Sequence, residues 1–470
     1  MARKHPHMTP SAFVRLLRRH SGGPLRLEGA TITGDLDLTG QVLDFDLELL
    51  GCLVHGNLIL DGLTGHSINV SGSRMGAVQG LRLRLSSDFS LRRAQIGSAG
   101  VPNPLTDHRT RSVGDAVVAP YRVPRHDAAP SAVLQLSDAR IDGDLVLSET
   151  TLASSGQWSL FADQLQVGGS ITGTNLIAAG ALYVRSARVG GAFYLNGAEI
   201  AGLEASVADI GRGLYADWGF VSTGQVRLRS AQVGILVTFH DAVTSSLNLA
   251  RLHTPRLRLD FREPPKGRVV LRDAQVDSFV DSPERWPEPG NLDLEGFSYR
   301  RLAESPGMDY RERLRWLSLD SHSGPSAFEQ LAQYYTRIGD ERSARLVRQA
   351  RQRRMRRGDK PPAKVWGALQ DVLFGYGYAP GRALAWLLVL VTAGSLWFAA
   401  RPPRAVRKDS PTYDPVLYTL DLIVPIANLG QRTAWDPVGI DKGVAVALIL
   451  SGWLLATAVI AGVGRLLNRG

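Results

Sequence analysis

The sequence has almost no cysteine, since Cys52 is the single one in 470 residues. One thiol excludes intramolecular disulfides, thiolate metal clusters and a Cys-x-x-Cys redox pair. The first residues, Met-Ala-Arg-Lys-His-Pro-His-Met, lack the apolar region of a secretory signal peptide. We therefore expect the bulk of the chain to be cytoplasmic.

Motifs for catalysis are also scarce. The sequence contains no Walker A motif, no His-Glu-x-x-His and no Gly-x-Ser-x-Gly, and its ten histidines are scattered. Gly211-Arg-Gly213-Leu-Tyr-Ala216 matches a dinucleotide fingerprint, but no helical pattern follows it. Asp138, Asp142 and Asp144 alternate with apolar residues and should point into solvent. We predict no catalytic residue, no cofactor and no metal, and the scarcity of motifs argues against an enzyme.

Net positive charge is concentrated in one block. The formal charge is +10, and residues 337–364 hold eleven Lys and Arg against three acidic residues, which leaves +2 for the rest. This block lies just before an apolar segment, and such basic residues stay on the cytoplasmic side of a membrane. Its position argues against nucleic-acid binding and favours contact with anionic headgroups. The expected membrane-surface residues are Arg351, Arg353, Arg354, Arg356, Arg357 and Lys364.

Two long uncharged runs close the chain, at residues 383–400 and 444–463. A helix that rises 1.5 Å per residue needs about 20 apolar residues to cross a hydrocarbon core. Trp386 and Trp397 lie near the ends of the first run, where interfacial aromatic residues gather. We predict two membrane spans, with the C-terminus on the cytoplasmic side of the plasma (inner) membrane.

A degenerate repeat fills residues 25–300. Its phrase is Ala-x-(Ile/Val)-x-Gly-x-Leu-x-Leu, as at 30–38, 139–147 and 187–195. Looser copies begin at Ala94, Ala208, Ala231 and Ala274, and the spacing lies in the twenties. Such a period, with apolar residues alternating at period 2, is typical of a solenoid. The fold class is therefore mainly β, a β-solenoid of about ten coils that is roughly 50 Å long at the strand spacing of a sheet. A leucine-rich repeat is the alternative, but its asparagine ladder is missing.

The ends of a solenoid need capping. Thr9-Pro10 predicts the start of a helix, with Phe13, Leu16 and Leu17 on one apolar face. The pattern gives four parts, which are a capping helix at 1–24, the solenoid at 25–300 with an inserted loop at 98–131, a helical cap and basic segment at 301–364, and a membrane domain at 365–470. In the third part Gly339 should end one helix and Asp340 should cap the next.

The apolar segment 415–431 between the two runs is too short to span a membrane. Two interpretations stay open. The favoured one is a helix that lies on the outer membrane surface, and the other is a re-entrant loop. The candidate loop residues are Tyr418, Asp421, Pro425, Asn428, Gly430 and Gln431. A carboxylate near lipid needs a partner, and Arg432 and Lys442 are the nearest cations in sequence. The Gly-Tyr-Gly at 375–377 precedes the first run, where it suits an interfacial helix better than an ion filter.

The repeat resembles relaxed pentapeptide-repeat and bactofilin-like β-solenoids. The C-terminal part resembles bacterial membrane-anchored repeat proteins with a two-helix membrane domain. The residues that carry this second likeness are 331–340, Gly-Tyr-Gly-Tyr at 375–378, 418–431 and 452–457. Some members of that group bear the label membrane-associated oxidoreductase, yet the chain has no flavin or nicotinamide fingerprint. The resemblance implies an inner-membrane protein.

Two functions from different classes follow as hypotheses. The first is a membrane-anchored cytoplasmic scaffold whose solenoid binds another macromolecule. The second is an oligomeric two-span channel or transporter-like protein, with a re-entrant loop at 415–431 and the solenoid as a regulatory domain. The expected partners are the lipid bilayer and a protein, and a homo-oligomer is left open. An enzyme with a site on the 98–131 insertion is a third alternative.

Overall fold

A computed structural model describes residues 7–97, 132–302, 309–320, 324–355, 380–407, 411–424 and 429–467, the side chains of 283, 380–384 and 454–467 excepted. The predicted insertion at 98–131 lies outside the described residues. The chain divides into two compact units, Met1–Gln330 and Leu331–Gly470.

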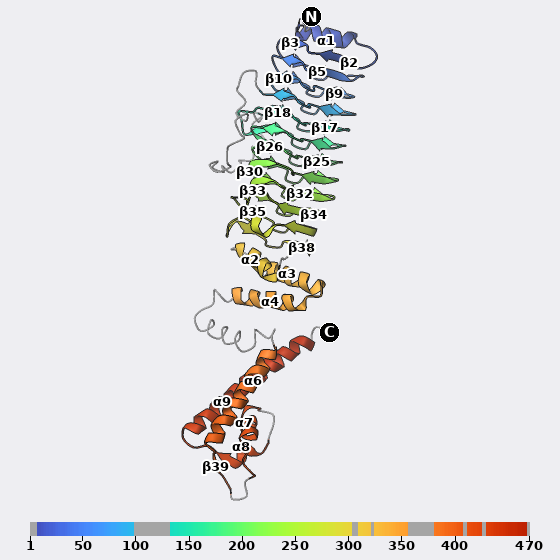
Figure 1. The fold of residues 1–470 in the computed structure, drawn as a ribbon. Helices are drawn as coiled ribbons and strands as arrows, with labels where there is room; N and C mark the ends of the chain where they lie inside the picture. Colours follow the sequence, from blue (N-terminus) through green and yellow to red (C-terminus); the bar gives the residue numbers. More distant parts are fainter. Residues whose placement is uncertain are drawn as a thin grey trace. The chain divides into compact units, whose positions relative to one another are not determined.

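The first unit is a β-solenoid whose coils contribute short strands to four columns of parallel strands (Figure 1). Column 1 consists of β2 (Leu25–Glu28), β5 (Leu47–Leu50), β9 (Ile68–Asn69), β13 (Phe89–Ser90), β17 (Leu145–Val146), β21 (Ile171–Thr172), β25 (Phe193–Tyr194), β29 (Gly213–Tyr215), β32 (Leu236–His240) and the second halves of β34 (His253–Asp260), β36 (Gln275–Asp281) and β38 (Ser298–Leu302). Column 2 consists of β1 (His7–Met8), β3 (Thr31–Ile32), β6 (Leu53–Val54), β10 (Arg74–Met75), β14 (Gln95–Ile96), β18 (Thr151–Leu152), β22 (Ile177–Ala178), β26 (Glu199–Ile200) and the first halves of β30 (Val221–Arg227) and β33 (Val243–Asn248).

Columns 3 and 4 complete each coil. Column 3 consists of β4 (Leu36–Asp37), β7 (Leu58–Ile59), β11 (Val78–Gln79), β15 (Leu134–Gln135), β19 (Trp158–Phe161), β23 (Ala181–Tyr183), β27 (Leu203–Glu204), the second halves of β30 and β33, β35 (Val269–Val270) and β37 (Leu292–Asp293). Column 4 consists of β8 (Thr64–Gly65), β12 (Arg84–Leu85), β16 (Arg140–Ile141), β20 (Gln166–Val167), β24 (Arg188–Val189), β28 (Asp209–Ile210), β31 (Gln232–Val233) and the first halves of β34, β36 and β38.

The solenoid has about 12 turns within its described residues, so the expected number of about ten was too low. Equivalent residues of successive coils pair in register, for example Ile171 with Phe193 and Phe193 with Leu214. At the strand spacing of a sheet, 12 turns stack over roughly 55 Å. The insertion leaves the ladder intact, because β14 and β15 on either side of it pair with strands of both adjacent coils.

The core is a stack of inward side chains, as the alternation predicted. Ile141, Leu145, Val189 and Phe193 are all buried. Close stacking requires the glycine of the repeat phrase, because a Cβ on Gly191 would lie 2.8 Å from the carbonyl oxygen of Gly169 in the preceding coil. The residue before it, Gly190, is equally confined, since a Cβ there would collide with the carbonyl oxygen of Gly168. The Gly211–Ala216 segment forms strands β28 and β29, not the helix of a dinucleotide fold.

Side chains of the repeat also link successive coils by hydrogen bonds to the backbone. Asp144 Oδ1 accepts a hydrogen bond from the backbone N–H of Ser170 at 2.6 Å, and Asp88 Oδ1 accepts one from Asp144 N–H at 2.7 Å. A Cβ on Gly169 would collide with the Asp144 carboxylate. Asp144 is therefore a coil-to-coil link, while Asp142 pairs with Arg140 on the surface at 2.8 Å.

Helix α1 (Pro10–Arg19) caps the first coil as predicted. Thr9 is its N-cap, with Oγ1 accepting from Ala12 N–H at 3.3 Å, and Pro10 is its first residue. Its apolar residues Phe13 and Leu17 are buried. The cap covers unpaired strand edges and apolar core that would otherwise face solvent.

Helix α2 (Tyr310–Leu319) closes the other end through a buried ion pair. Arg313 donates from Nη1 and Nη2 to both oxygens of Asp281, at 2.9 and 2.8 Å, and the two side chains are 4% and 0% exposed. Trp286 Nε1 donates to the same carboxylate at 2.8 Å, after the turn η3 (Pro283–Arg285). Trp316 stacks on Phe279 with ring centroids 6.0 Å apart, so aromatic rings fill the space around the pair.

The predicted helical hairpin consists of α3 (Pro325–Arg337) and α4 (Glu341–Met355). Gly339 ends the first helix with φ at 83°, and Asp340 Oδ1 accepts from Ser343 N–H at 2.9 Å. Both residues therefore have their expected roles.

Among the described residues from 380 onward there are four helices, with a short hairpin beside them. They are α6 (Pro380–Ala400), α7 (Pro415–Ile423), α8 (Gln431–Ala434) and α9 (Ile440–Leu467), and the hairpin pairs β39 (Arg404–Ala405) with β40 (Trp435–Asp436). Their core contains Phe398, Tyr418, Leu422, Ile423 and Leu448.

We predict that Leu145→Asp destabilises the solenoid by at least about 3 kcal/mol, because the new carboxylate is buried without a partner. Val146→Asp, one residue along β17 and only partly buried, should have a small effect. Urea unfolding followed by circular dichroism measures both. Equal stability of the two variants would contradict the inward assignment of Leu145.

Arg313→Met should cost about 3–5 kcal/mol, since it leaves Asp281 charged and buried. Arg311→Met is the matched control on the same helix, because the Arg311 side chain is 75% exposed. Both can be compared in the same unfolding assay. A loss for Arg313→Met no larger than that for Arg311→Met would show that the cap does not depend on the pair.

Candidate functional site

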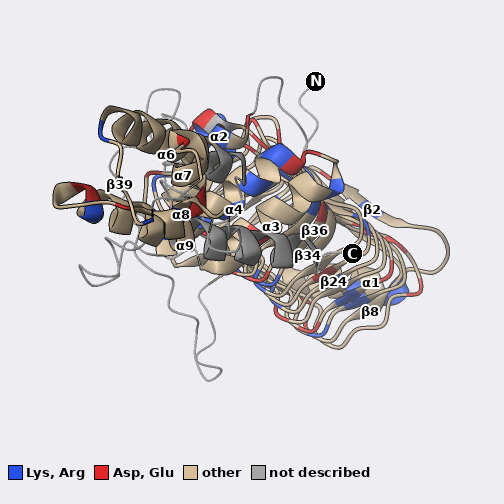
Figure 2. Ribbon diagram, turned by 90° about the horizontal axis from the view of Figure 1, so that it is seen from below, with Lys and Arg blue, Asp and Glu red and all other residues tan. Residues whose placement is uncertain are grey.

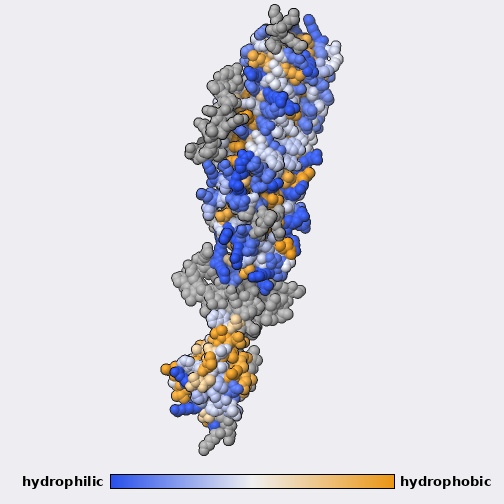
Figure 3. Space-filling model, in the orientation of Figure 1, coloured by the Kyte–Doolittle hydropathy of each residue, from blue (hydrophilic) through white to orange (hydrophobic). Residues whose placement is uncertain are grey.

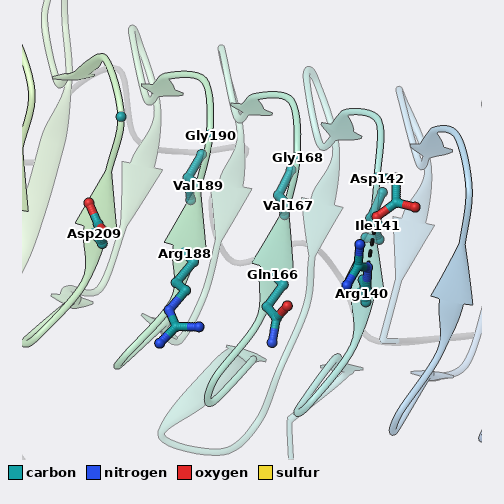
Figure 4. Close-up of a pocket in the computed structure, with 11 residues that line it drawn as sticks. Arg140, Ile141, Asp142, Gln166, Val167, Gly168, Arg188, Val189, Gly190 and Asp209 are labelled. Atoms are coloured by element: carbon teal, nitrogen blue, oxygen red, sulfur yellow. Dashed lines mark hydrogen bonds and ion pairs between the residues drawn. The ribbon is translucent and has the colours of Figure 1, made fainter.

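A shallow groove of about 300 Å³ crosses four coils on column 4 (Figure 4). Arg140, Gln166, Arg188 and Asp209 occupy equivalent positions of successive coils along it, and the corner beside them is made of glycine. Arg140 is held by Asp142, whereas the Arg188 side chain makes no hydrogen bond or ion pair with the described residues. Binding pockets for small molecules are concave and enclosed, so this shallow, open groove suits contact with a macromolecule.

A larger concavity of about 470 Å³ lies on column 3, between Tyr183 and Asn248. Its floor holds Glu204, which is only 4% exposed. Arg227 Nη1 lies 3.2 Å from Glu204 Oε2, and Ser206 N–H donates to Glu204 Oε1 at 3.1 Å. Arg227 Nε also donates to Gln225. The site is thus a fixed, hydrogen-bonded charge pair under a polar rim.

Aromatic rings border this concavity. Phe161 stacks on Tyr183 at 4.5 Å, and Trp158 meets Tyr183 edge-on at 5.0 Å. Burial raises the pKa of the Tyr183 hydroxyl, against a hydrogen bond with Arg185 that lowers it. Trp158, Tyr183 and Ala132 pack in one cluster, and Ala132 directly follows the 98–131 insertion in sequence.

Sequence reasoning missed this site. Glu204 and Arg227 are 23 residues apart and come together because that separation is one coil. An acidic and a basic residue separated by one coil period is the signal that would have found the pair. Figure 2 shows both signs of charge along the coils, so such pairs are common on this surface.

A second polar cluster contains a histidine. His240 Nδ1 lies 2.8 Å from Asp260 Oδ2, and Ser282 Oγ donates to Asp260 Oδ1 at 2.7 Å. Burial raises the pKa of Asp260, but hydrogen bonds from Ser282, Arg258 and His240 outweigh it and hold the pKa below its ordinary value. The serine is bonded to the carboxylate instead of the imidazole, so the histidine does not activate it as a nucleophile.

Metal and thiol chemistry have little support in the described residues. No group of three or more His, Cys, Asp or Glu among them is placed to hold a metal ion. Cys52 is buried, and burial raises the pKa of its thiol, which makes a reactive thiolate unfavourable.

Of the predicted loop residues, Tyr418, Asp421 and Gln431 are buried and Gly430 is the N-cap of α8, with φ at 77°. Helix α7 packs between α6 and α9. Pro425 and Asn428 lie outside the described residues.

Asp421 binds backbone instead of a cationic side chain. Its Oδ1 accepts from Leu429 N–H at 2.9 Å and its Oδ2 from Arg432 N–H at 2.7 Å. The carboxylate is 3% exposed. Its two hydrogen bonds join the end of α7 to the start of α8. Arg432 is therefore a partner of Asp421, as expected, but it binds through its backbone N–H and not through its guanidinium.

The predicted basic residues fall on and after α4. Arg353 is exposed and Arg351 and Arg354 are partly buried, whereas Arg356, Arg357 and Lys364 lie outside the described residues. The Gly-Tyr-Gly segment at 375–377 also lies outside them.

In the part of the chain that the structure describes, which includes α6 and α9, no helix is long and apolar enough to cross a membrane. Comparison with protein-family models, with curated proteins and with solved structures gives no match to this chain.

We predict that Arg227→Met destabilises the solenoid by about 3–5 kcal/mol, since Glu204 would be left charged and buried. The double variant Glu204→Gln, Arg227→Met should recover most of that loss, because no charge then remains unpaired. A double-mutant cycle by urea unfolding measures the coupling. Additive losses would show that Glu204 and Arg227 act independently.

Proposed function

We propose that this protein is a scaffold anchored in the inner membrane by α6 and α9, with a cytoplasmic solenoid that binds another macromolecule. The observation that carries the proposal is that these helices are apolar on their outward faces as well as on their packed faces. A helix that is apolar all round is either a core helix or a membrane span.

The outward face of α6 includes Leu388, Val389 and Leu396, which are 69%, 53% and 68% exposed. On α9, Val446 and Leu450 are 49% and 64% exposed. Figure 3 shows hydrophobic surface gathered on these helices, while the visible solenoid is mainly hydrophilic. A contiguous apolar surface of this kind marks an interaction with lipid or protein.

The inward faces supply the packing between the helices. Phe398 and Leu448 belong to their shared core, with Leu390 and Val391 against it. The sequence carries no charge from 383 to 400 in α6 or from 444 to 463 in α9. Both runs have the length of a span.

A polar rim joins the end of α6 to the start of α9. Trp397 Nε1 donates to Asp441 Oδ1 at 3.0 Å, and the Arg401 guanidinium lies 4.3 Å from the centre of the Trp397 ring. Tyr413 and Trp435 pack against each other nearby at 5.0 Å. Tryptophan, tyrosine and charged residues at one end of an apolar hairpin are typical of a membrane–water interface.

Orientation follows from the basic block at 337–364, which favours a cytoplasmic solenoid. The resemblance of the C-terminal part to membrane-anchored repeat proteins supports the same arrangement. On the solenoid, the Glu204–Arg227 concavity and the column 4 groove are the surfaces we assign to a protein partner, because both are open and lined by charged side chains.

The anchoring can be tested by substitution of the outward face. Leu388→Lys combined with Leu396→Lys should release much of the protein from the carbonate-washed membrane fraction, since each lysine costs about 2.5–3.5 kcal/mol in a span. Val42→Lys on the solenoid, at a residue 70% exposed, is the control and should not change the distribution. Wild-type protein found wholly in the soluble fraction would refute the proposal.

Topology can be tested by labelling with an impermeant maleimide in intact cells. A cysteine at Thr433, on the rim, should react, and one at Ser326, beside the solenoid, should react only after lysis. Both positions are exposed, and native Cys52 is buried. The opposite pattern would overturn the assigned orientation.

A channel is the second candidate, favoured by the burial of α7 between two apolar helices. The channel proposal requires ion flux through reconstituted protein, whereas a scaffold gives none. Asp421→Asn is a poor probe of conduction, because that carboxylate accepts two backbone hydrogen bonds.

A further inference from the structure

We infer that α7 is a re-entrant helix that dips into the outer leaflet and does not lie on the membrane surface. The inference rests on the proposed membrane anchoring and adds the depth of α7. Its evidence is the set of contacts that place α7 against the middle of both long apolar helices.

The contacts with α6 fix the direction of α7. Tyr413 Oη, just before α7, donates to the Phe398 carbonyl at 2.9 Å near the end of α6. The Tyr418 ring meets the Phe398 ring at 5.0 Å, and a Cβ on Gly394 would lie 2.5 Å from Thr419 Cγ2. As α7 proceeds, its contacts therefore move back along α6, away from the rim.

The contact with α9 fixes the depth. A Cβ on Gly452 would collide with the carbonyl oxygen of Ile423, the last residue of α7. At the rise of a helix, Gly394 lies about 9 Å below Ala400, and Gly452 about 12 Å below Val444. Half of the hydrocarbon core is about 15 Å thick. The end of α7 therefore reaches most of the way to the bilayer centre.

Hydrogen bonds to Asp421 satisfy the backbone groups that would otherwise be unpaired at this depth in the membrane. Non-helical backbone in a membrane must be satisfied and buried in protein. Asp421 accepts the N–H groups of Leu429 and Arg432, at 2.9 and 2.7 Å, on the segment that returns toward the rim. Asp421, Thr419 and Tyr418 are all buried. The outward residues Val416 and Leu417, 47% and 41% exposed, are apolar and suit contact with lipid.

The experiment measures depth in phosphatidylcholine–phosphatidylglycerol vesicles that contain the full chain. A fluorophore is attached to single cysteines at Leu420, Leu450, Leu388 and Thr433, in separate variants. Quenching by lipids with a nitroxide on the mid-acyl chain is divided by quenching from a headgroup nitroxide. The ratio at Leu420 should match that at Leu450 and exceed that at Thr433.

Each outcome separates this inference from the proposed function. If Leu388 and Leu450 are deep but Leu420 behaves like Thr433, α7 lies on the surface and the inference is overturned, while the anchor stands. If acyl-chain quenching is absent at all four positions, both the anchor and the re-entrant helix fall.

A substitution tests the contact that sets the depth. Gly452→Leu should push α7 away from α9 and lower the ratio at Leu420, with Leu388 unchanged. Gly443→Leu is the matched control on α9, because a Cβ there meets no atom within 4 Å. An unchanged ratio at Leu420 in Gly452→Leu, or an equal drop in Gly443→Leu, would count against the packing that we infer.

Discussion

The coil-to-coil ladder of parallel backbone hydrogen bonds is the constraint on which the solenoid depends. Each strand of an inner coil is held by one strand of the coil before it and one of the coil after it, as Leu145 is between Phe89 and Ile171. Strands of two residues are enough only because the whole stack is in register. The two end coils lack one neighbour, so α1 and the Arg313–Asp281 cap of α2 are part of the fold and not additions to it.

The corners of the coils leave the outer surface free to vary. Close stacking requires glycine where a Cβ would collide with the previous coil, as at Gly190, and a short acceptor where a backbone N–H of the next coil must be satisfied, as at Asp144. Outside these positions the chain carries polar groups of both signs, and neighbouring coils combine them. Glu204 with Arg227, and Asp293 with Arg268 and Arg272 at 2.9 and 3.0 Å, are built in this way. Such a surface is open, which suits recognition of a macromolecule better than enclosure of a substrate.

The helices at the end of the chain follow the opposite pattern. On α6, α7 and α9 large apolar residues such as Leu388, Val416 and Leu450 are exposed, and the carboxylate of Asp421 is turned inward to backbone N–H groups. This arrangement is the one that a nonpolar solvent favours, because polar groups must then be satisfied within the protein. The solenoid and these helices thus have surfaces matched to different surroundings, and this contrast supports the proposed anchor.

The sequence by itself determined the β-solenoid, the capping helix after Thr9 and the hairpin turn at Gly339–Asp340, because each rests on local periodicity or on capping chemistry within a few residues. It underestimated the number of coils, since some coils depart from the repeat phrase, as at Ser73, which is equivalent to Ala94, and at Gly80, which is equivalent to Leu136. It did not reveal the Glu204–Arg227 site, because stacking joins residues that are one coil apart. Nor did it resolve the place of residues 415–423. A short apolar helix has the same pattern whether it lies on a surface or packs between two others, and only the contacts of Thr419 with Gly394 and of Ile423 with Gly452 distinguish the two.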